Sequence, residues 1–541
     1  MIRDDDVRAD HPDAIVRIAR EQYEGMRSQL ARLGQIEQIE QEYAELKAQF
    51  EWLRRQLFGT KSETRHGVPA EQIALFNAQP TDTGEHAPKI TVPAHERQKL
   101  RSGEEVNDTG LRFGPEVPVK EIRLSCAELQ GSDADRYEVI DYKVSLRLAR
   151  QPGSHVVLKY LRPVLRDKAA VAASAPALIT APAPLGVLDH AQVDVSFLAG
   201  ALVDKFVYHV PLYRQHQRLA DEGIVLSRST PDKWVLDAIA LLEPVARAVR
   251  VAILAGGRLK VDETPIRAGR TKVAATGQGK MKQGWLWPIL GEHGDIAFYY
   301  AASRAGSVLK EVLGESWRGT LQTDGYNVYA KYAAGLPGCV HALCWAHTRR
   351  AFLKAESVDP KPVAQALEMI RALYAIEAEL RKAGADAATI LATRRARSEP
   401  IVDRFFEWVS AEIGKPELLP SSALARALGY ARERERGLRE FLRDAWLALD
   451  TNDLERALRV IPMGKKNWLF CTTEFGAQQV ATIQTLLATC RAHEIDAYTY
   501  LVDVLQRINH HPATRINELA PRAWAERFGH DPIRSDLARS Q

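Results

Sequence analysis

Two short apolar stretches, each ending in an aspartate, constrain the fold of this chain more than any other feature. In the first, residues 259–261 alternate apolar and polar side chains up to Asp262, and Pro265 then weakens the strand's hydrogen-bond ladder. The second runs from Gly319 to Asp324 and is followed by a glycine. Each pattern predicts a β-strand that presents an acid at its end. We therefore expect the two aspartates on neighbouring strands of one sheet.

A third acid, Glu455, lies in a segment where Leu454, Leu458 and Ile461 have a helical spacing. Together with the two aspartates it forms a set of oxygen ligands, which hard divalent cations such as Mg²⁺ prefer. Attack on a phosphodiester builds negative charge on the entering and leaving oxygens, and two cations roughly 3.5–4 Å apart stabilise both. We predict a metal-dependent phosphoryl-transfer enzyme acting on DNA, with Asp262 bridging the metals.

Each acid also has a purely structural explanation. Asp324 followed by glycine is a turn sequence, and Glu455 with Arg459 has the i,i+4 spacing of a surface ion pair on a helix. Glu263 follows Asp262 directly and is expected on the opposite face of the strand, so it is not counted as a ligand.

Composition does not identify the class of protein, but it argues against a membrane span and against a disulfide-bonded secreted domain. A chain of 541 residues needs several domains, and a net charge of +4 is too small to indicate nucleic-acid binding without local clusters of charge. The most apolar long stretch, 236–256, contains Asp237 and Arg247, so no membrane span is expected. Five cysteines, four of them after residue 338, do not form a disulfide framework. The expected location is the cytoplasm, in association with the nucleoid.

The N-terminal half is expected to hold four segments. Ile36, Tyr43, Phe50 and Leu57 recur every seven residues, which predicts a coiled-coil helix at 21–64 that associates with a second copy. The alternative is an amphipathic helix packed on its own chain. The other three segments are a polar linker at 65–95, a β-rich module at 96–168 and an Ala/Pro-rich linker at 169–189.

Residues 190–250 are predicted to form a helix–turn–helix. The first helix covers 211–220, the break falls at Gly223, and the second helix starts near residue 227 with Ser229 or Thr230 as its cap and Pro231 in its first turn. The alternative is an ordinary helical hairpin. The basic side chains expected to contact DNA phosphates are Arg214, Arg218, Arg228 and Lys233.

The remainder predicts a mixed α/β sheet of the ribonuclease-H kind. Its first part, 257–345, contains the two acidic strands, a hairpin made from 284–290 and 295–300, an amphipathic helix at 308–313 and a further strand at 339–344. A helical insertion at 346–447, the rest of the core with Glu455 at 448–490, and a helical segment at 491–541 complete a multidomain α+β fold.

Two further groups of side chains are candidates for DNA contact and for zinc binding, respectively. Lys465, Lys466 and Trp468, with Arg459 just before them, are expected to contact DNA; the alternative is solvated lysines beside a core tryptophan. Four residues have the chemistry of zinc ligands, but their spacing mixes a strand with a helix start. We expect buried cysteines and hydrogen-bonded histidines there instead of zinc. These residues are Cys339, His341, Cys344 and His347.

In sequence order, these motifs resemble those of the insertion-sequence-66 transposases. The resemblance is dense over about 190 to 520 and extends to Leu57-Phe58-Gly59 and Leu75-Phe76, which are similar to that family's leucine-zipper region. It is carried by Val-Asp262-Glu-Thr-Pro, Gln-Thr-Asp324-Gly-Tyr, Cys344-Trp-Ala-His347-Thr-Arg-Arg-Ala-Phe352, Glu455-Arg-Ala-Leu-Arg459, Gly464-Lys-Lys-Asn-Trp-Leu-Phe470, Tyr213-Arg-Gln, Ser227-Arg-Ser-Thr-Pro-Asp-Lys-Trp-Val235, and Tyr500 to Ile508 with His511-Pro512.

The resemblance implies an Asp-Asp-Glu transposase with a ribonuclease-H-like core, Mg²⁺ or Mn²⁺ as cofactor, and Asp262, Asp324 and Glu455 as the catalytic triad. It also implies that Cys344 and His347 support the active site. Such an enzyme binds the terminal inverted repeats of its element, frees 3′-hydroxyls and transfers them into target DNA, often with element-encoded helper proteins.

One departure from the family pattern concerns the zinc finger that precedes its helix–turn–helix. Here that region contains only Cys126, so a four-cysteine site cannot be assembled. Two rival functions remain: a non-catalytic DNA-binding regulator, and a nuclease of the same fold that hydrolyses DNA without joining it.

Overall fold

The computed structural model describes residues 111–270, 280–468 and 471–538, apart from 116, 131–133, 152, 168–177, 185 and 190. The predicted coiled coil at 21–64 and linker at 65–95 lie outside the described residues. Residues 101–541 form one compact unit, and the following paragraphs concern its described part.

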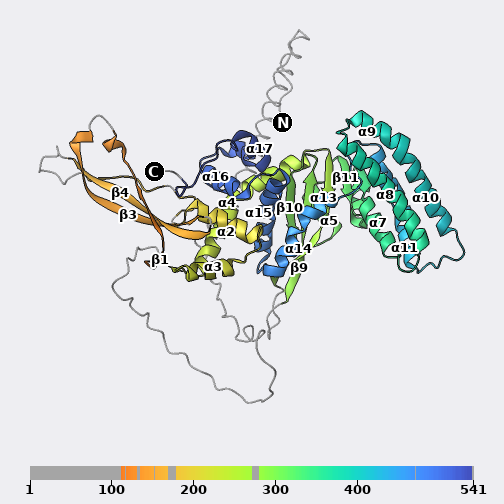
Figure 1. Cartoon of the computed structure of the whole chain (residues 1–541), viewed down its shortest axis with the longest axis horizontal. Coiled ribbons are helices and arrows are strands. Elements are labelled where there is room, and N and C mark those ends of the chain that lie inside the picture. The colour runs from red at the N-terminus through yellow and green to blue at the C-terminus, as the bar shows by residue number, and fades with distance from the viewer. Residues whose placement is uncertain are drawn as a thin grey trace, which may run out of the picture. The chain divides into compact units, whose positions relative to one another are not determined.

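A six-stranded mixed sheet lies at the centre of this unit (Figure 1). The strand order is β10-β9-β7-β11-β12, and β8 pairs with β9. Strands β7 and β11 are parallel, as are β11 and β12, whereas β9 runs antiparallel to β7, β8 and β10. The strands are β7 (Arg258–Val261), β8 (Thr264–Arg270), β9 (Met281–Gly291), β10 (Ile296–Ala301), β11 (Gly319–Thr323) and β12 (Cys339–Leu343).

The predicted strands, the hairpin and the helix α5 (Gly306–Leu313) are all present. Pro265 was expected to weaken the hydrogen-bond ladder, and β7 does end before it, at Val261. The chain re-enters the sheet as β8, in which Pro265 lies opposite Trp285 of β9. Proline is tolerated where a strand lies at the margin of a sheet, because its missing N–H is not needed there.

Helix α15 (Glu474–Ala492) packs along β10 and satisfies the backbone of that strand. Strand β10 lies at the end of the strand order, so alternate N–H groups have no partner strand. The Thr485 hydroxyl accepts the N–H of Phe298 at 2.9 Å, and the Thr489 hydroxyl accepts that of Ile296 at 3.0 Å. Two threonine hydroxyls on one helix thus accept the backbone N–H groups that a neighbouring strand would otherwise pair with.

Replacing Thr485 by valine is expected to lower the free energy of unfolding by about 1–3 kcal/mol, because the buried N–H of Phe298 loses its acceptor while the volume is unchanged. Urea unfolding followed by circular dichroism measures this loss. Thr482→Val, on the same helix but only half-buried, is the matched control and should unfold like the wild type. Equal stability of the two variants would contradict the role of the Thr485 hydroxyl.

Three helices precede the sheet, namely α2 (Val195–Phe206), α3 (Leu212–Asp221) and α4 (Ser229–Leu254). The break between α3 and α4 falls at Gly223, where φ is +82°, as predicted. The chain then forms β6 (Ile224–Val225), which pairs with β1 (Arg112–Phe113). The predicted caps were wrong: α4 has no side-chain cap, because the Ser229 hydroxyl bonds the Ser227 hydroxyl at 2.7 Å instead.

The β-rich module contains β2 (Val119–Arg123), β3 (Tyr137–Gln151), β4 (Ser154–Asp167) and β5 (Leu178–Thr180). The strand order is β2-β4-β3, with β5 also on β4. Strand β5 lies within the stretch expected to be a linker, so that expectation fails for these residues. Cys126 is a buried free thiol beside this sheet.

Between β12 and Glu455 the described chain is helical and has its own hydrophobic core around Trp345, Phe352 and Phe405. After it come α13 (Asn452–Leu458), α14 (Val460–Trp468), α15, α16 (Ala497–Arg507) and α17 (Pro521–Arg527). None of the described helices combines the length and apolar character that a membrane span requires. The helices before α13 are α7 (Trp345–Leu353), α8 (Pro360–Lys382), α9 (Ala387–Thr393), α10 (Glu399–Ile413), α11 (Ala423–Glu433) and α12 (Glu435–Arg439).

Candidate active site

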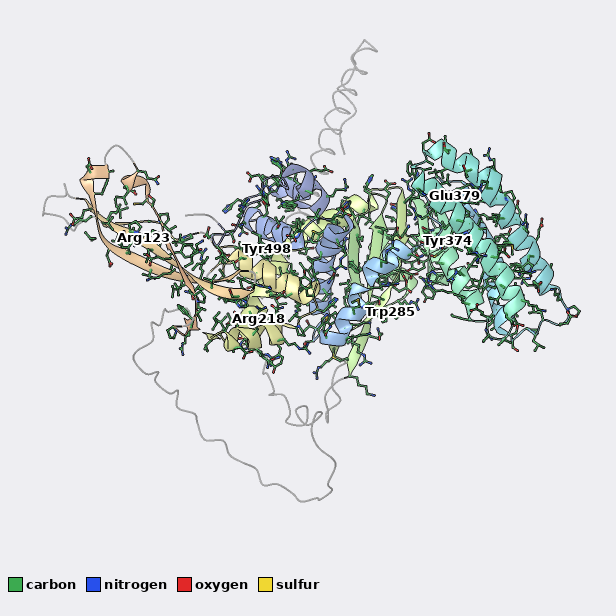
Figure 2. All side chains as sticks on the ribbon, viewed as in Figure 1. Arg123, Arg218, Trp285, Tyr374, Glu379 and Tyr498 are labelled. Carbon is green, nitrogen blue, oxygen red and sulfur yellow. The ribbon has the colours of Figure 1, made fainter. Side chains whose placement is uncertain are left out.

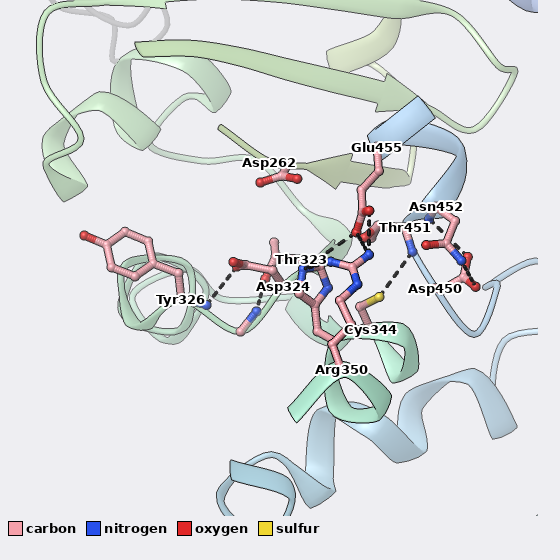
Figure 3. Close-up of polar contacts among 12 residues, drawn as sticks. Asp262, Thr323, Asp324, Tyr326, Cys344, Arg350, Asp450, Thr451, Asn452 and Glu455 are labelled. Atoms are coloured by element: carbon pink, nitrogen blue, oxygen red, sulfur yellow. Dashed lines mark hydrogen bonds and ion pairs between the residues drawn. The ribbon is translucent and has the colours of Figure 1, made fainter. Parts of the chain in front are cut away.

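Asp262 and Asp324 each follow the last residue of a strand, at the same edge of the sheet (Figure 3). Strands β7 and β11 are parallel neighbours, with Lys260 opposite Gln322. Each aspartate lies two residues further along its strand direction, so the register brings the two acids to the same level. This is the juxtaposition that the sequence predicted.

The turn that carries Asp324 is held from both sides. The Oδ1 atom of Asp324 accepts the N–H of Tyr326 at 2.9 Å. Asp324 therefore also has the structural role in a turn that its sequence suggested. From the helical insertion, the Tyr430 hydroxyl donates to the carbonyl of Asp324, and Arg434 donates to the carbonyl of Gly325 at 3.0 Å. Gly325 has φ of +92°, and a Cβ there would lie 2.6 Å from the Arg434 guanidinium. The insertion therefore fixes the position of a candidate catalytic acid.

Glu455 lies in the first turn of α13, and its partner is Arg350 of α7. The Arg350 Nη2 atom lies 2.5 Å from both carboxylate oxygens, and His347 Nε2 lies 3.7 Å from Oε1. Figure 3 shows this guanidinium directly beneath Glu455. The expected alternative, an ion pair between Glu455 and Arg459, is not the pairing that the structure contains.

The three acids influence one another electrostatically. Burial, together with the negative charges of Glu263, Asp324 and Glu455, raises the pKa of Asp262 to about 7, although a hydrogen bond from the Glu263 N–H lowers it. A cluster of carboxylates that repel one another in this way is stabilised by a bound cation.

A pH dependence of stability follows from the raised pKa of Asp262. The folded protein holds this proton up to a pH of about 7, whereas the unfolded chain releases it near pH 3.9, so stability falls as pH rises between these values. The contribution of Asp262 to this fall is at most about 1.4 kcal/mol per pH unit. In EDTA, Asp262→Asn is therefore expected to be more stable than the wild type at pH 8. At pH 5 this advantage in stability should be smaller. Urea titrations at both pH values test this, and a variant less stable than the wild type at pH 8 would contradict it.

Glu263 is buried and fully engaged, so it is not available as a ligand. Arg304 donates to one carboxylate oxygen, with its Nε atom at 2.6 Å, and the Tyr329 hydroxyl donates to the other. Arg304 also lies 4.0 Å from the ring centroid of Tyr326, next to Asp324. The Glu263–Arg304 pair thus links the end of β7, beside Asp262, to the turn that follows Asp324.

The chemistry of the donor set fits a hard divalent cation, since all three groups are carboxylates. As the side chains stand, however, no three His, Cys, Asp or Glu residues of the described chain are arranged so that they could hold a metal ion. Both carboxylate oxygens of Glu455 instead accept hydrogen bonds from Arg350.

The four residues considered for zinc have separate roles. The Cys344 thiol is buried and accepts the N–H of Thr451 at 3.4 Å, which links α7 to the start of α13. His341 bonds the Thr323 hydroxyl at 2.9 Å, just before Asp324. Burial lowers the pKa of His347, and its buried Nδ1 atom has no hydrogen-bond partner among the described residues. Cys339 is half-buried, and burial raises the pKa of its thiol to about 11.

The side chains predicted to contact DNA form two groups. On α3 and α4, Arg218 (labelled in Figure 2) pairs with Glu222 at 2.8 Å, and Arg228 lies 5.0 Å from the ring centroid of Tyr213. Arg214 and Lys233 lie on the same two helices. In the second group, Lys465 donates to the carbonyl of Pro265. Trp468 packs on the main hydrophobic core and over Gly464. Lys466 is exposed on the same helix, and Arg459 is the C-cap residue of α13.

Sequence reasoning missed Arg350, Tyr430 and Arg434. Arg350 stands three residues after His347, a spacing that places both side chains on one face of a helix, and this signal was available. Nothing in the sequence indicated that Tyr430 and Arg434, more than 100 residues after Asp324, contact its turn.

Comparison with known proteins gives matches along most of the chain. The model of the family described as "Transposase IS66 family" matches residues 190–479, that of the "IS66 C-terminal element" matches 485–522, and that described as "Transposase C of IS166 homeodomain" matches 45–105. The first of these spans α2 to α4, the sheet, the helical insertion and Glu455.

Similar proteins occur in Sinorhizobium fredii (strain NBRC 101917 / NGR234). The uncharacterized protein y4qI is 30% identical over 524 residues, which are 91% of this chain and 92% of that protein. The uncharacterized protein y4hP is 34% identical over 375 residues, and this alignment spans 64% of this chain and 65% of y4hP. Among solved structures, a Drosophila P element transposase strand transfer complex covers 56% of this chain and 93% of its own at 11% identity. Its TM-score of 0.32 is too low to define a common fold.

Proposed function

The chain belongs to the IS66 family of transposases, and from this premise we propose that it cleaves and joins DNA strands with Asp262, Asp324 and Glu455 as its catalytic acids. The observation that carries the proposal is the register of β7 and β11, which brings two strand-end aspartates together beside the helix that bears Glu455. The mixed sheet, with three antiparallel strands followed by two parallel ones, supports a ribonuclease-H-like core.

Mg²⁺ or Mn²⁺ held by the three carboxylates would stabilise the charge that develops on the entering and leaving oxygens of the phosphodiester. The chain's own residues prepare this site. Asp262 is kept at the end of β7 with a raised pKa, so it responds strongly to a nearby positive charge. Arg350 pairs with Glu455, so its guanidinium would compete with a cation for that carboxylate. Cys344 and His347 support the position of α13 and of Arg350.

DNA is the proposed partner. The basic residues of α3 and α4, together with Lys466 at the end of α14, would contact phosphates of the element ends. The coiled coil predicted at 21–64, which overlaps the match at 45–105, would join two copies so that both ends are held. Element-encoded helper proteins are a further proposed partner.

A joining assay tests the proposal and separates it from its rivals. The purified chain is incubated with Mg²⁺, a labelled duplex that ends in the terminal repeat of the element with a pre-cut 3′-hydroxyl, and a target plasmid. Labelled plasmid is the expected product. A parallel reaction contains the same duplex with its end uncut. Cleavage of this uncut end without any joining would favour a nuclease, and end binding with neither reaction would favour a DNA-binding regulator.

A further inference from the structure

A half-open groove lies next to the candidate active site, on the same face of the sheet. Its volume is about 1110 Å³, and apolar side chains line its floor, among them Leu290 and Ile296 of the sheet and Leu487 of α15. Lys260 and Gln322 also line it. They stand two residues before Asp262 and Asp324 on β7 and β11, so they share a face of the sheet with those acids, about 7 Å away along the strands.

Two aromatic side chains at the rim of this groove are unusually exposed. Tyr208, just after α2, is 69% exposed, and Trp446, at the end of the helical insertion, is 64% exposed. Tyr498 (labelled in Figure 2) at the start of α16 also lines the groove. Large aromatic rings that project into solvent beside an apolar floor are typical of surfaces on which unpaired bases stack. We call Tyr208 and Trp446 the groove aromatics.

The charges along the groove leave two guanidinium groups without an ion-pair partner in the described chain. Arg258 pairs with Glu292 at 2.9 Å, and Lys260 pairs with Asp453 at 2.7 Å, so these four charges cancel. Asp496 caps α16 by accepting the N–H of Thr499. Arg456 and Arg491, which we call the groove arginines, line the groove together with two acids, Glu494 and Asp496, so the lining as a whole carries no net charge. Arginine is well suited to bind phosphate, because its planar fork donates two parallel hydrogen bonds.

Gln322 adds an unpaired hydrogen-bond acceptor to the floor. Its side chain is 1% exposed, and its Nε2 donates to the carbonyl of Ala448 at 2.7 Å. Its Oε1 atom is buried without a hydrogen-bond partner among the described residues. A buried acceptor left in this state is unfavourable, and the amino group of a nucleobase is a donor that would satisfy it.

We propose that this groove binds single-stranded DNA beside the reacting phosphodiester. Bases stack on the groove aromatics, the groove arginines hold the backbone, and Gln322 accepts a hydrogen bond from a base. The inference rests on the proposed function, because it takes DNA as the substrate. It adds that one strand has to be unpaired near the cleavage point.

Fluorescence anisotropy of the full-length chain in EDTA, with a fluorescein-labelled 20-nucleotide oligothymidine as probe, tests the groove without any DNA cleavage. Trp446→Ala is expected to weaken binding about 5- to 150-fold, the fold-change that corresponds to about 1–3 kcal/mol of stacking per base. The double variant Arg456→Gln/Arg491→Gln is expected to weaken binding and reduce its dependence on salt. Trp446→Phe, which keeps an aromatic ring, should bind within a few-fold of the wild type.

Arg371→Gln, an exposed arginine on α8, is the matched charge control and should bind like the wild type. Unchanged binding by Trp446→Ala would overturn the groove proposal. So would a wild-type chain that joins end duplexes but does not bind the oligonucleotide, and that result would leave the transposase proposal intact. Conversely, groove-dependent binding of the oligonucleotide by a chain that neither cleaves nor joins ends would support the groove and count against the transposase.

Discussion

Replacing Asp262 by asparagine is expected to abolish strand cleavage and joining while leaving the binding of end DNA unchanged. Asparagine has nearly the same shape but no charge, so the site loses one of its three negative charges and a proposed metal ligand. Removal of a single preorganised group that stabilises transition-state charge costs about 10²–10³ in rate. Loss of a shared metal ligand should exceed that, so we expect a decrease of more than about 10³-fold in the rate of cleavage.

The experiment compares single-turnover cleavage of a labelled end duplex by the wild type and by Asp262→Asn, with end binding measured in EDTA by gel shift. Asp403→Asn provides a matched control, because Asp403 is a half-exposed acid on α10 that pairs with Arg439 in the helical insertion. The control should cleave like the wild type. Full cleavage activity in Asp262→Asn would remove Asp262 from the catalytic set.

Replacing Arg394 by methionine is expected to destabilise the helical insertion by about 3–5 kcal/mol, because it leaves the carboxylate of Glu377, whose side chain is only 13% exposed, without its partner. Arg394 is 2% exposed, and its Nε and Nη2 atoms lie 2.8 and 2.7 Å from the two oxygens of Glu377. It also donates to the carbonyls of Phe441, Asp444 and Leu447, in the segment that leads to α13. One side chain therefore ties the insertion to the chain that carries Glu455.

Urea unfolding measures this loss, and the insertion should unfold at a lower urea concentration than in the wild type. Arg397→Met is the control: Arg397 lies three residues away and pairs with Glu379, but both side chains are exposed, so little change is expected. The double variant Arg394→Met/Glu377→Met removes the stranded charge and should regain part of the lost stability. An Arg394→Met variant as stable as Arg397→Met would show that this buried pair does not hold the insertion.

The sequence was sufficient to predict the part of the site that depends on strands. Alternation up to Asp262 and the short strand before Asp324 are local patterns, and parallel pairing of β7 with β11 then places both acids at one edge. The helical spacing of Leu454 and Ile461 was equally informative, since both are buried and Glu455 therefore faces away from that core.

Contacts between distant segments could not be predicted in the same way. The bond from Tyr430 to the Asp324 carbonyl joins positions more than 100 residues apart, and no periodicity records it. The same is true of the contact between Arg350 and Glu455, whose predicted role was that of a metal ligand, with a pair to Arg459 as the structural alternative. Strand β5 was missed because Ala and Pro nearby indicate a linker, whereas pairing with β4 decides the conformation of Leu178–Thr180.

The proposed mechanism requires Asp262, Asp324 and Glu455 to converge on shared divalent cations. Anomalous diffraction from crystals of the full chain soaked in Mn²⁺ tests it most directly. We expect an anomalous peak bounded by oxygens of all three acids, with Arg350 withdrawn from Glu455. A peak elsewhere, or no peak while Glu455 remains bound to Arg350 at saturating Mn²⁺, would contradict it.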